Sequence, residues 1–308
     1  MSGRRWLEPG MRSVRGAFRV AARRALGPRG ELTVHRTYHR LLRAISHFEP
    51  PESPELLALL KGTAAEASTF LDIGANVGRY ATFLRRHSSP NALLYAIEPN
   101  PYAFSLLQAN LKSRSNVCCL QIALGDRDGK AFLSVPVDPS GNPISALGHI
   151  TEQASPGEAC FEIELRRLDS LVGEGLVNPT PPVFVKADIE GGESAFMSGA
   201  ARFFTDYRPI FYFECERAHL ERQGLGAQAI WHFLSELDYT VLAPGPVLTP
   251  CETILLGTSN YLAVPWKVVG AGVEYQVLSS QLKDLLVAEP RRRADRRETE
   301  ASAAHARR

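Results

Sequence analysis

The feature that most constrains this chain is an apolar segment that ends in an acid and leads into a glycine-containing loop. Residues 70–78 read Phe-Leu-Asp-Ile-Gly-Ala-Asn-Val-Gly, and a helix-like segment follows at 79–86. A second apolar segment, 92–97, ends at Glu98, 20 residues after Gly78. Strand, glycine loop, helix and a second strand that ends in an acid form the opening unit of a nucleotide-binding fold. The sequence therefore predicts an α/β protein with an open, mostly parallel sheet.

The spacing of the loop glycines indicates which cofactor fits. A dinucleotide site uses Gly-x-Gly-x-x-Gly, so that the backbone can approach a pyrophosphate at the helix N-terminus. Here Asn76 stands where the second close-approach glycine would be, which disfavours a diphosphate. A cofactor with a sulfonium, an amino group and a carboxylate fits better, because Asp72 can face the ammonium and the amides of Ala75 to Gly78 can bind the carboxylate. The loop favours S-adenosylmethionine; a tight turn without a ligand is the alternative.

Two later apolar segments also end in acids, one at Asp188 and the other at Glu214. In an open parallel sheet the ligand crevice lies outside the carboxyl ends of the strands. We therefore expect these two acids to meet Asp72 and Glu98 at one site.

The same region offers hard oxygen ligands of the kind that Mg²⁺ prefers, from Asp188, Glu190 and Glu214. Sequence spacing does not establish a metal site, and the prediction includes no metal.

Four motifs occur along the chain in a fixed order. They are Leu-Asp-Ile-Gly-Ala-Asn-Val-Gly at 71–78, Ala-Ile-Glu-Pro-Asn-Pro at 96–101, Ala-Leu-Gly-Asp-Arg-Asp-Gly at 123–129 and Val-Lys-Ala-Asp-Ile-Glu-Gly-Gly-Glu at 185–193. Together they resemble the FkbM-type methyltransferases, over the region from 65 to 217. The resemblance implies S-adenosylmethionine-dependent O-methylation of macrolide or sugar hydroxyls. It also implies a Rossmann-like class I methyltransferase fold, with a doubly wound, seven-stranded, mostly parallel sheet and a terminal antiparallel strand. Ala187 departs from the family pattern, which usually has Ile or Val there.

Roles for single residues follow from the chemistry of methyl transfer together with this resemblance. The enzyme must align the acceptor oxygen, the methyl group and the sulfur, and must remove the hydroxyl proton. We expect Asp188 nearest the reacting centre, as the base or as the group that orients the acceptor. Glu214 and His219 are weaker catalytic candidates, and a surface histidine without a role is the alternative for His219. The expected cofactor ligands are Asp72, Gly74, Ala75, Asn76 and Gly78 at the methionine portion, Glu98 at the ribose, and Asn100 and Asp126 beside the adenine.

Further segments read as secondary structure. Strands are expected at 117–122, 131–135, 161–165, 239–243 and 261–264, the last two antiparallel. Asp169 is expected to cap a short helix.

The chain divides into five predicted parts. They are a basic arm at 1–30, a helical cap at 31–64, the catalytic domain at 65–270, a C-terminal helix at 271–289 and a disordered tail at 290–308. The arm contains eight arginines and one acid, Glu8. Its residues 11–25 fit a basic amphipathic helix that would contact an anionic membrane surface or direct the chain to an organelle; a solvated basic arm is the alternative.

Composition indicates the compartment. No apolar run approaches the ~18 residues of a membrane span. The five cysteines have no CxxC spacing, which fits a reducing compartment. We expect a cytoplasmic enzyme, with membrane-surface or organelle association through the arm as the alternative.

The predicted partner is a small-molecule or glycan acceptor, whose identity depends on the cap and on residues 136–157. Two other functions stay open. The arginine-rich ends could give a nucleic-acid methyltransferase phosphate affinity. The chain lacks an Asn/Asp-Pro-Pro-Tyr motif, however, and we expect no specific nucleic acid. A non-catalytic binding protein could also retain the fold, because fold alone does not settle function.

Overall fold

The computed structural model describes residues 37, 49–111, 116–137, 148–153, 158–216, 228–255, 258, 260–266, 278 and 280. The predicted basic arm, the disordered tail and His219 lie outside the described residues, as does most of the C-terminal helix. The division into five parts therefore stays a prediction. Among the described residues, no helix combines the length and the apolar character needed to cross a membrane.

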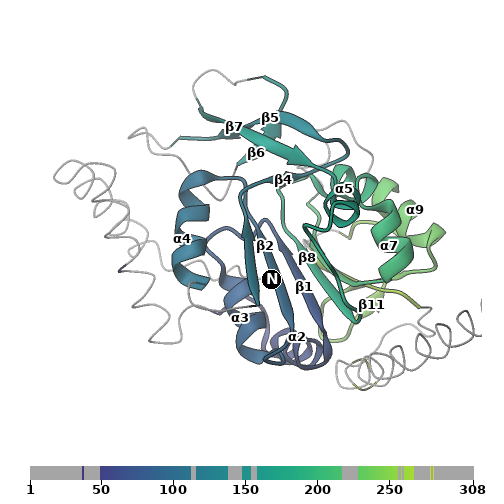
Figure 1. The fold of residues 1–308 in the computed structure, drawn as a ribbon. Coiled ribbons are helices and arrows are strands. Elements are labelled where there is room, and N and C mark those ends of the chain that lie inside the picture. Colours follow the sequence, from purple (N-terminus) through teal and green to yellow (C-terminus); the bar gives the residue numbers. More distant parts are fainter. Residues whose placement is uncertain are drawn as a thin grey trace, which may run out of the picture.

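An eight-stranded sheet forms the centre of the molecule (Figure 1). Its strands, in spatial order, are β11 (Thr249–Pro250), β10 (Thr240–Ala243), β12 (Asn260–Val264), β9 (Ile210–Glu214), β8 (Val183–Ala187), β1 (Thr69–Ile73), β2 (Leu93–Ile97) and β3 (Val117–Leu120). The strands from β9 to β3 are parallel, and β12 runs antiparallel to both β9 and β10. The mostly parallel sheet with a terminal antiparallel strand, β12, is thus confirmed, whereas β10, also predicted to be antiparallel, runs in the same direction as β9. The short β11 raises the number of strands from the predicted seven to eight.

Helices cover both faces of this sheet, because successive strand residues point to opposite sides. The helices on one face are α2 (Pro54–Glu66), α3 (Arg79–His87) and α4 (Pro101–Leu111), and those on the other are α5 (Leu168–Gly173), α6 (Glu193–Ser198), α7 (Ala201–Tyr207) and α9 (Gln228–Glu236). In β1, for example, Phe70 packs with the first group, whereas Leu71 and Ile73 pack with the second. The two buried layers make the fold doubly wound, as predicted.

A second, four-stranded sheet lies above the first in Figure 1. Its strands, in spatial order, are β4 (Ala123–Leu124), β7 (Ala159–Arg166), β5 (Gly129–Val135) and β6 (His149–Thr151). The strands predicted at 131–135 and 161–165 are confirmed, but they pair with each other in this separate sheet. An alternating pattern identifies a strand with one buried face and does not identify its partner.

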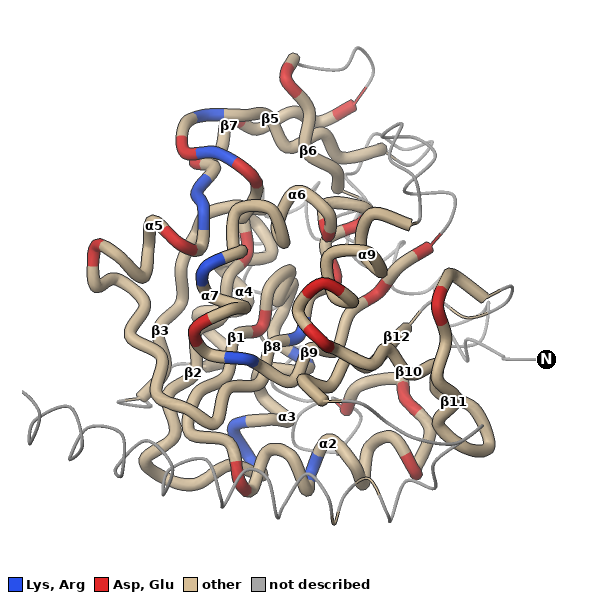
Figure 2. Tube along the Cα trace, turned by 90° about the vertical axis from the view of Figure 1, so that its right-hand side faces the viewer, with Lys and Arg blue, Asp and Glu red and all other residues tan. Residues whose placement is uncertain are grey.

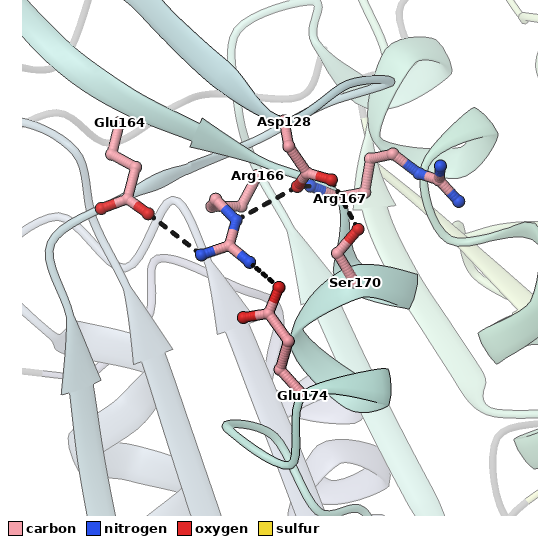
Figure 3. Close-up of polar contacts among 6 residues, drawn as sticks. All are labelled: Asp128, Glu164, Arg166, Arg167, Ser170 and Glu174. Atoms are coloured by element: carbon pink, nitrogen blue, oxygen red, sulfur yellow. Dashed lines mark hydrogen bonds and ion pairs between the residues drawn. The ribbon is translucent and has the colours of Figure 1, made fainter.

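A polar network joins the small sheet to α5 (Figure 3). Asp128 accepts hydrogen bonds from the Ser170 hydroxyl at 2.6 Å, the Arg167 backbone N–H at 2.9 Å and Arg166 Nε at 3.1 Å. These bonds, the Ser170 and Arg167 ones foremost, lower the pKa of Asp128 to about 2. The two further partners of the Arg166 guanidinium are Glu164 at 3.1 Å and Glu174 at 2.5 Å. The network fixes the turn that leads into β5.

Asp169 caps α7 and not α5, the helix in which it lies. It lies in the first turn of α5, and its carboxylate accepts from the backbone N–H groups of Arg202 at 3.1 Å and Phe203 at 2.9 Å, both in α7. The side chain therefore satisfies the N-terminus of α7, which has no cap of its own.

Candidate active site

The loop between β1 and α3 is built on left-handed backbone. Gly74, Asn76 and Gly78 have φ values of 70°, 49° and 86°. The N–H groups of Gly74 and Ala75 donate to the Ile97 carbonyl at 3.0 and 2.9 Å, and the Gly78 N–H donates to the Ala75 carbonyl at 2.8 Å. Of the amides that the sequence assigns to a cofactor carboxylate, those of Ala75 and Gly78 thus have backbone partners within the protein, and that of Asn76 donates to Glu98.

Gly74 marks the closest approach between this loop and the segment after β8. A Cβ atom at position 74 would lie 1.9 Å from the carbonyl oxygen of Asp188. Only glycine leaves room for that approach and adopts the positive φ without strain. The predicted cofactor loop therefore contacts the backbone of the predicted catalytic acid.

Glu98 holds the same loop from β2. Its carboxylate accepts from the backbone N–H groups of Asn76 and Asn100, both at 2.8 Å, and the side chain is buried. Burial raises the pKa of Glu98 to about 7, although the two amide hydrogen bonds oppose that shift. The structure thus brings together three of the predicted cofactor residues, from two neighbouring strand ends.

Asn100 also has a structural role. Its Oδ1 accepts from the N–H groups of Tyr102 at 3.0 Å and Ala103 at 3.3 Å, which caps the N-terminus of α4. Asp126, the other residue expected beside the adenine, lies on the turn before β5. Its side chain is 53% exposed and pairs with Arg127 at 3.6 Å.

Asp72 is completely buried under α3. Its Oδ2 accepts from the Ala81 N–H at 2.8 Å, and its Oδ1 lies 3.3 Å from Lys186 Nζ. Burial raises the pKa of Asp72, and the attraction of Lys186 and the Ala81 hydrogen bond act against that shift. In the structure Asp72 thus neutralises a lysine and anchors α3.

Lys186 is the residue of this site that the sequence analysis missed. It is 3% exposed and lies in β8 among Phe184, Val185 and Ala187. Lysine is almost never fully buried unless it is paired. A lysine inside an otherwise apolar strand therefore indicates that an acid lies close to it.

Three carboxylates gather where β8 and β9 end. One carboxylate oxygen from each of Asp188, Glu190 and Glu214 lies within 4.8 Å of the other two. Burial, followed by repulsion from Asp188, raises the pKa of Glu214 to about 9. The Asp188 side chain is 39% exposed. Glu190 and Glu214 are partly exposed as well, and Asp188 stays the predicted base.

A family model described as "Methyltransferase FkbM domain" matches residues 72–241, more than half of the 308-residue chain. Two curated relatives are similar to it. "2-O-methyltransferase NoeI" of Sinorhizobium fredii (strain NBRC 101917 / NGR234) is 27% identical over 184 residues, which cover 56% of this chain and 74% of the relative. "Methyltransferase 1" of Beauveria bassiana (strain ARSEF 2860) is 26% identical over 153 residues, which cover 43% and 58%.

Two solved structures can be superposed on part of the chain. The FkbM methyltransferase from Methylobacillus flagellatus KT is 18% identical with a TM-score of 0.38, covering 64% of this chain and 44% of that one. The O-methyltransferase from Bacillus cereus, in complex with SAH, is 14% identical with a TM-score of 0.40, covering 80% and 96%. Because both TM-scores are below 0.5, these superpositions do not support the fold assignment, which rests on the strand order of the main sheet.

Proposed function

Because the chain belongs to the methyltransferase FkbM domain family and is a methyltransferase, we propose that it methylates a hydroxyl oxygen with S-adenosylmethionine. We further propose that the acceptor is a small molecule, either a polyketide or a sugar or glycan. The name of the Sinorhizobium relative, a 2-O-methyltransferase, supports oxygen as the methyl acceptor.

One observation supports the proposal above all others. The loop glycine at 74 touches the backbone of Asp188, and the same loop is hydrogen-bonded through Asn76 to Glu98. The groups expected to hold the cofactor and the group expected to take the proton therefore belong to one contiguous edge of the sheet. This is where open α/β sheets bind their ligands.

The residues present fit the cofactor. Gly74 and Gly78 let the loop pack closely against the Asp188 carbonyl and the Leu107 side chain, and Glu98 offers a buried carboxylate suited to ribose hydroxyls. S-adenosylmethionine would supply an electrophilic methyl group on a sulfonium. The chain would orient the acceptor hydroxyl at Asp188, whose carboxylate accepts the proton that the oxygen loses.

Calorimetric titration with S-adenosylmethionine tests the cofactor. Wild-type protein should bind it at micromolar concentration. Glu98→Ala should weaken binding by about tenfold or more, because it removes the acceptor for the ribose hydroxyls and for the Asn76 and Asn100 amides. Glu162→Gln, on the exposed face of β7, is the matched control and should bind like the wild type. Binding of NAD in place of S-adenosylmethionine, or equal affinity in wild type and Glu98→Ala, would refute the assignment. An acceptor screen that measures S-adenosylhomocysteine release follows.

The described residues give no support to a nucleic-acid substrate. Basic and acidic positions are interspersed along the described chain, without a continuous basic stripe (Figure 2). Nucleic-acid binding depends on such a surface.

The cytoplasmic location is also part of the proposal. It is supported by five cysteines that all lack a disulfide. Membrane contact through residues 11–25 stays a prediction outside the described residues.

A further inference from the structure

Lys186 lies in a polar row that crosses the sheet beneath the candidate site. In the strand register it stands opposite Asp72 of β1 on one side and Tyr212 of β9 on the other. All three are buried, with exposed fractions of 3%, 0% and 2%. The row faces α3, because Asp72 binds the Ala81 N–H of that helix. The three strands end one or two residues further along, and Asp188 follows Lys186 by two residues at this carboxyl edge.

The ammonium group of Lys186 contacts four different segments. Nζ lies 3.3 Å from Asp72 Oδ1, 3.6 Å from Asp188 Oδ2 and 3.2 Å from the Gly74 carbonyl oxygen, to which it donates. It also lies 4.9 Å from the centre of the Tyr80 ring, a cation–π contact with the first turn of α3. Burial lowers the pKa of Lys186, but the attraction of Asp72 and Asp188 outweighs it, so the group stays charged.

The Lys186 ammonium has three N–H donors, and the ion pair with Asp72 engages only part of this capacity. The remaining contacts are directed to the cofactor loop, at the Gly74 carbonyl, and to the partly exposed carboxylate of Asp188. The Gly74 backbone is also the point where the loop touches the Asp188 carbonyl. One cation therefore contacts both halves of the site, the cofactor loop and the acceptor acid.

We propose that Lys186 is a positioning residue for methyl transfer. Its ammonium group holds the Gly74 carbonyl and the Asp188 carboxylate in one arrangement, so that a bound cofactor and an acceptor oxygen are presented to each other in line. This inference rests on the proposed function. Lys186 acts through Gly74 and Asp188 and does not touch the reacting atoms.

The test must separate positioning from stability, because Lys186→Met alone leaves Asp72 buried without a counter-charge. The double variant Lys186→Met/Asp72→Asn removes both charges and should recover most of the Tm that Lys186→Met loses. Its kcat should nevertheless stay about tenfold or more below that of the wild type, because the Asp188 carboxylate no longer has the Lys186 ammonium group beside it. Lys130→Met, an exposed lysine of the small sheet, is the control and should keep full activity.

A second, single variant tests the contacts of Lys186 with Gly74 and with Asp188 separately. Its result can be interpreted even if the double variant does not fold. Lys186→Gln keeps a donor toward the Gly74 carbonyl but has no charge for Asp188. Calorimetry should show S-adenosylhomocysteine affinity within about threefold of wild type, whereas kcat falls about tenfold. If kcat in Lys186→Gln, or in the folded double variant, stays within threefold of wild type, Lys186 is only a core ion-pair partner. If wild-type protein binds neither S-adenosylmethionine nor its product, the proposed function itself fails, and this inference with it.

Discussion

Gly74→Ala is the substitution whose effect the structure defines most closely. The new Cβ would lie 1.9 Å from the Asp188 carbonyl oxygen, where ordinary contacts begin at about 3.4 Å, so one of the two backbones must move by more than 1 Å. The residue also has φ +70°, which costs a non-glycine residue about 1–2 kcal/mol. Overpacking adds about 1–3 kcal/mol. We therefore expect a loss of about 2–5 kcal/mol, which corresponds to a Tm lower by roughly 5–15 °C in a domain of this size.

The functional loss should be larger than the loss of stability implies. A misplacement of about 1 Å between reacting groups can cost on the order of 100-fold in rate. Thermal unfolding measures the Tm, and calorimetric titration with S-adenosylmethionine measures the cofactor affinity of the loop. Gly173→Ala is the matched control, because a Cβ there meets nothing within 4 Å and the backbone has no positive φ. If Gly74→Ala has the same Tm and cofactor affinity as Gly173→Ala, the claim that the loop and the β8 segment meet at this point is wrong.

Three further predictions concern stability. Burial raises the pKa of Glu193 to about 8 from an ordinary 4.5, so the folded state holds this proton more tightly and stability should fall as pH rises from about 5 to 8. Glu193→Gln should flatten that slope in urea unfolding at several pH values; an unchanged slope would contradict the assignment. Asp128 has its pKa lowered to about 2, so its stabilising contribution is present above pH 4 and is lost as pH falls toward 2. Asp128→Asn should lower the Tm much more at pH 7 than at pH 2, and an equal loss at both pH values would count against the network of Figure 3. Asp169→Ala should cost about 0.5–2 kcal/mol through the lost cap of α7, with cofactor affinity preserved; a variant as stable as wild type would refute that cap.

The sequence by itself determined the order of the elements and the positions of the acids. The period of apolar residues predicts strands and helices locally. The rule that parallel strands end at one edge then predicts that Asp72, Glu98, Asp188 and Glu214 approach one another. In the structure the carboxylates of Asp188 and Glu214 lie close together at this edge, as the rule predicts. These features need only local patterns and one topological rule.

Only the tertiary structure decided which groups become partners across the chain. Asp72 meets Lys186, 114 residues away, because β1 and β8 are neighbours in register. Asp169 caps α7 and not α5, the helix in which it lies. Strands β5 and β7 pair with each other in the small sheet and are not part of the main sheet. Such pairings follow from which strands and helices are adjacent. The apolar pattern of one segment specifies its own buried face, whereas a hydrogen bond or an ion pair also needs the distance and register of a second segment.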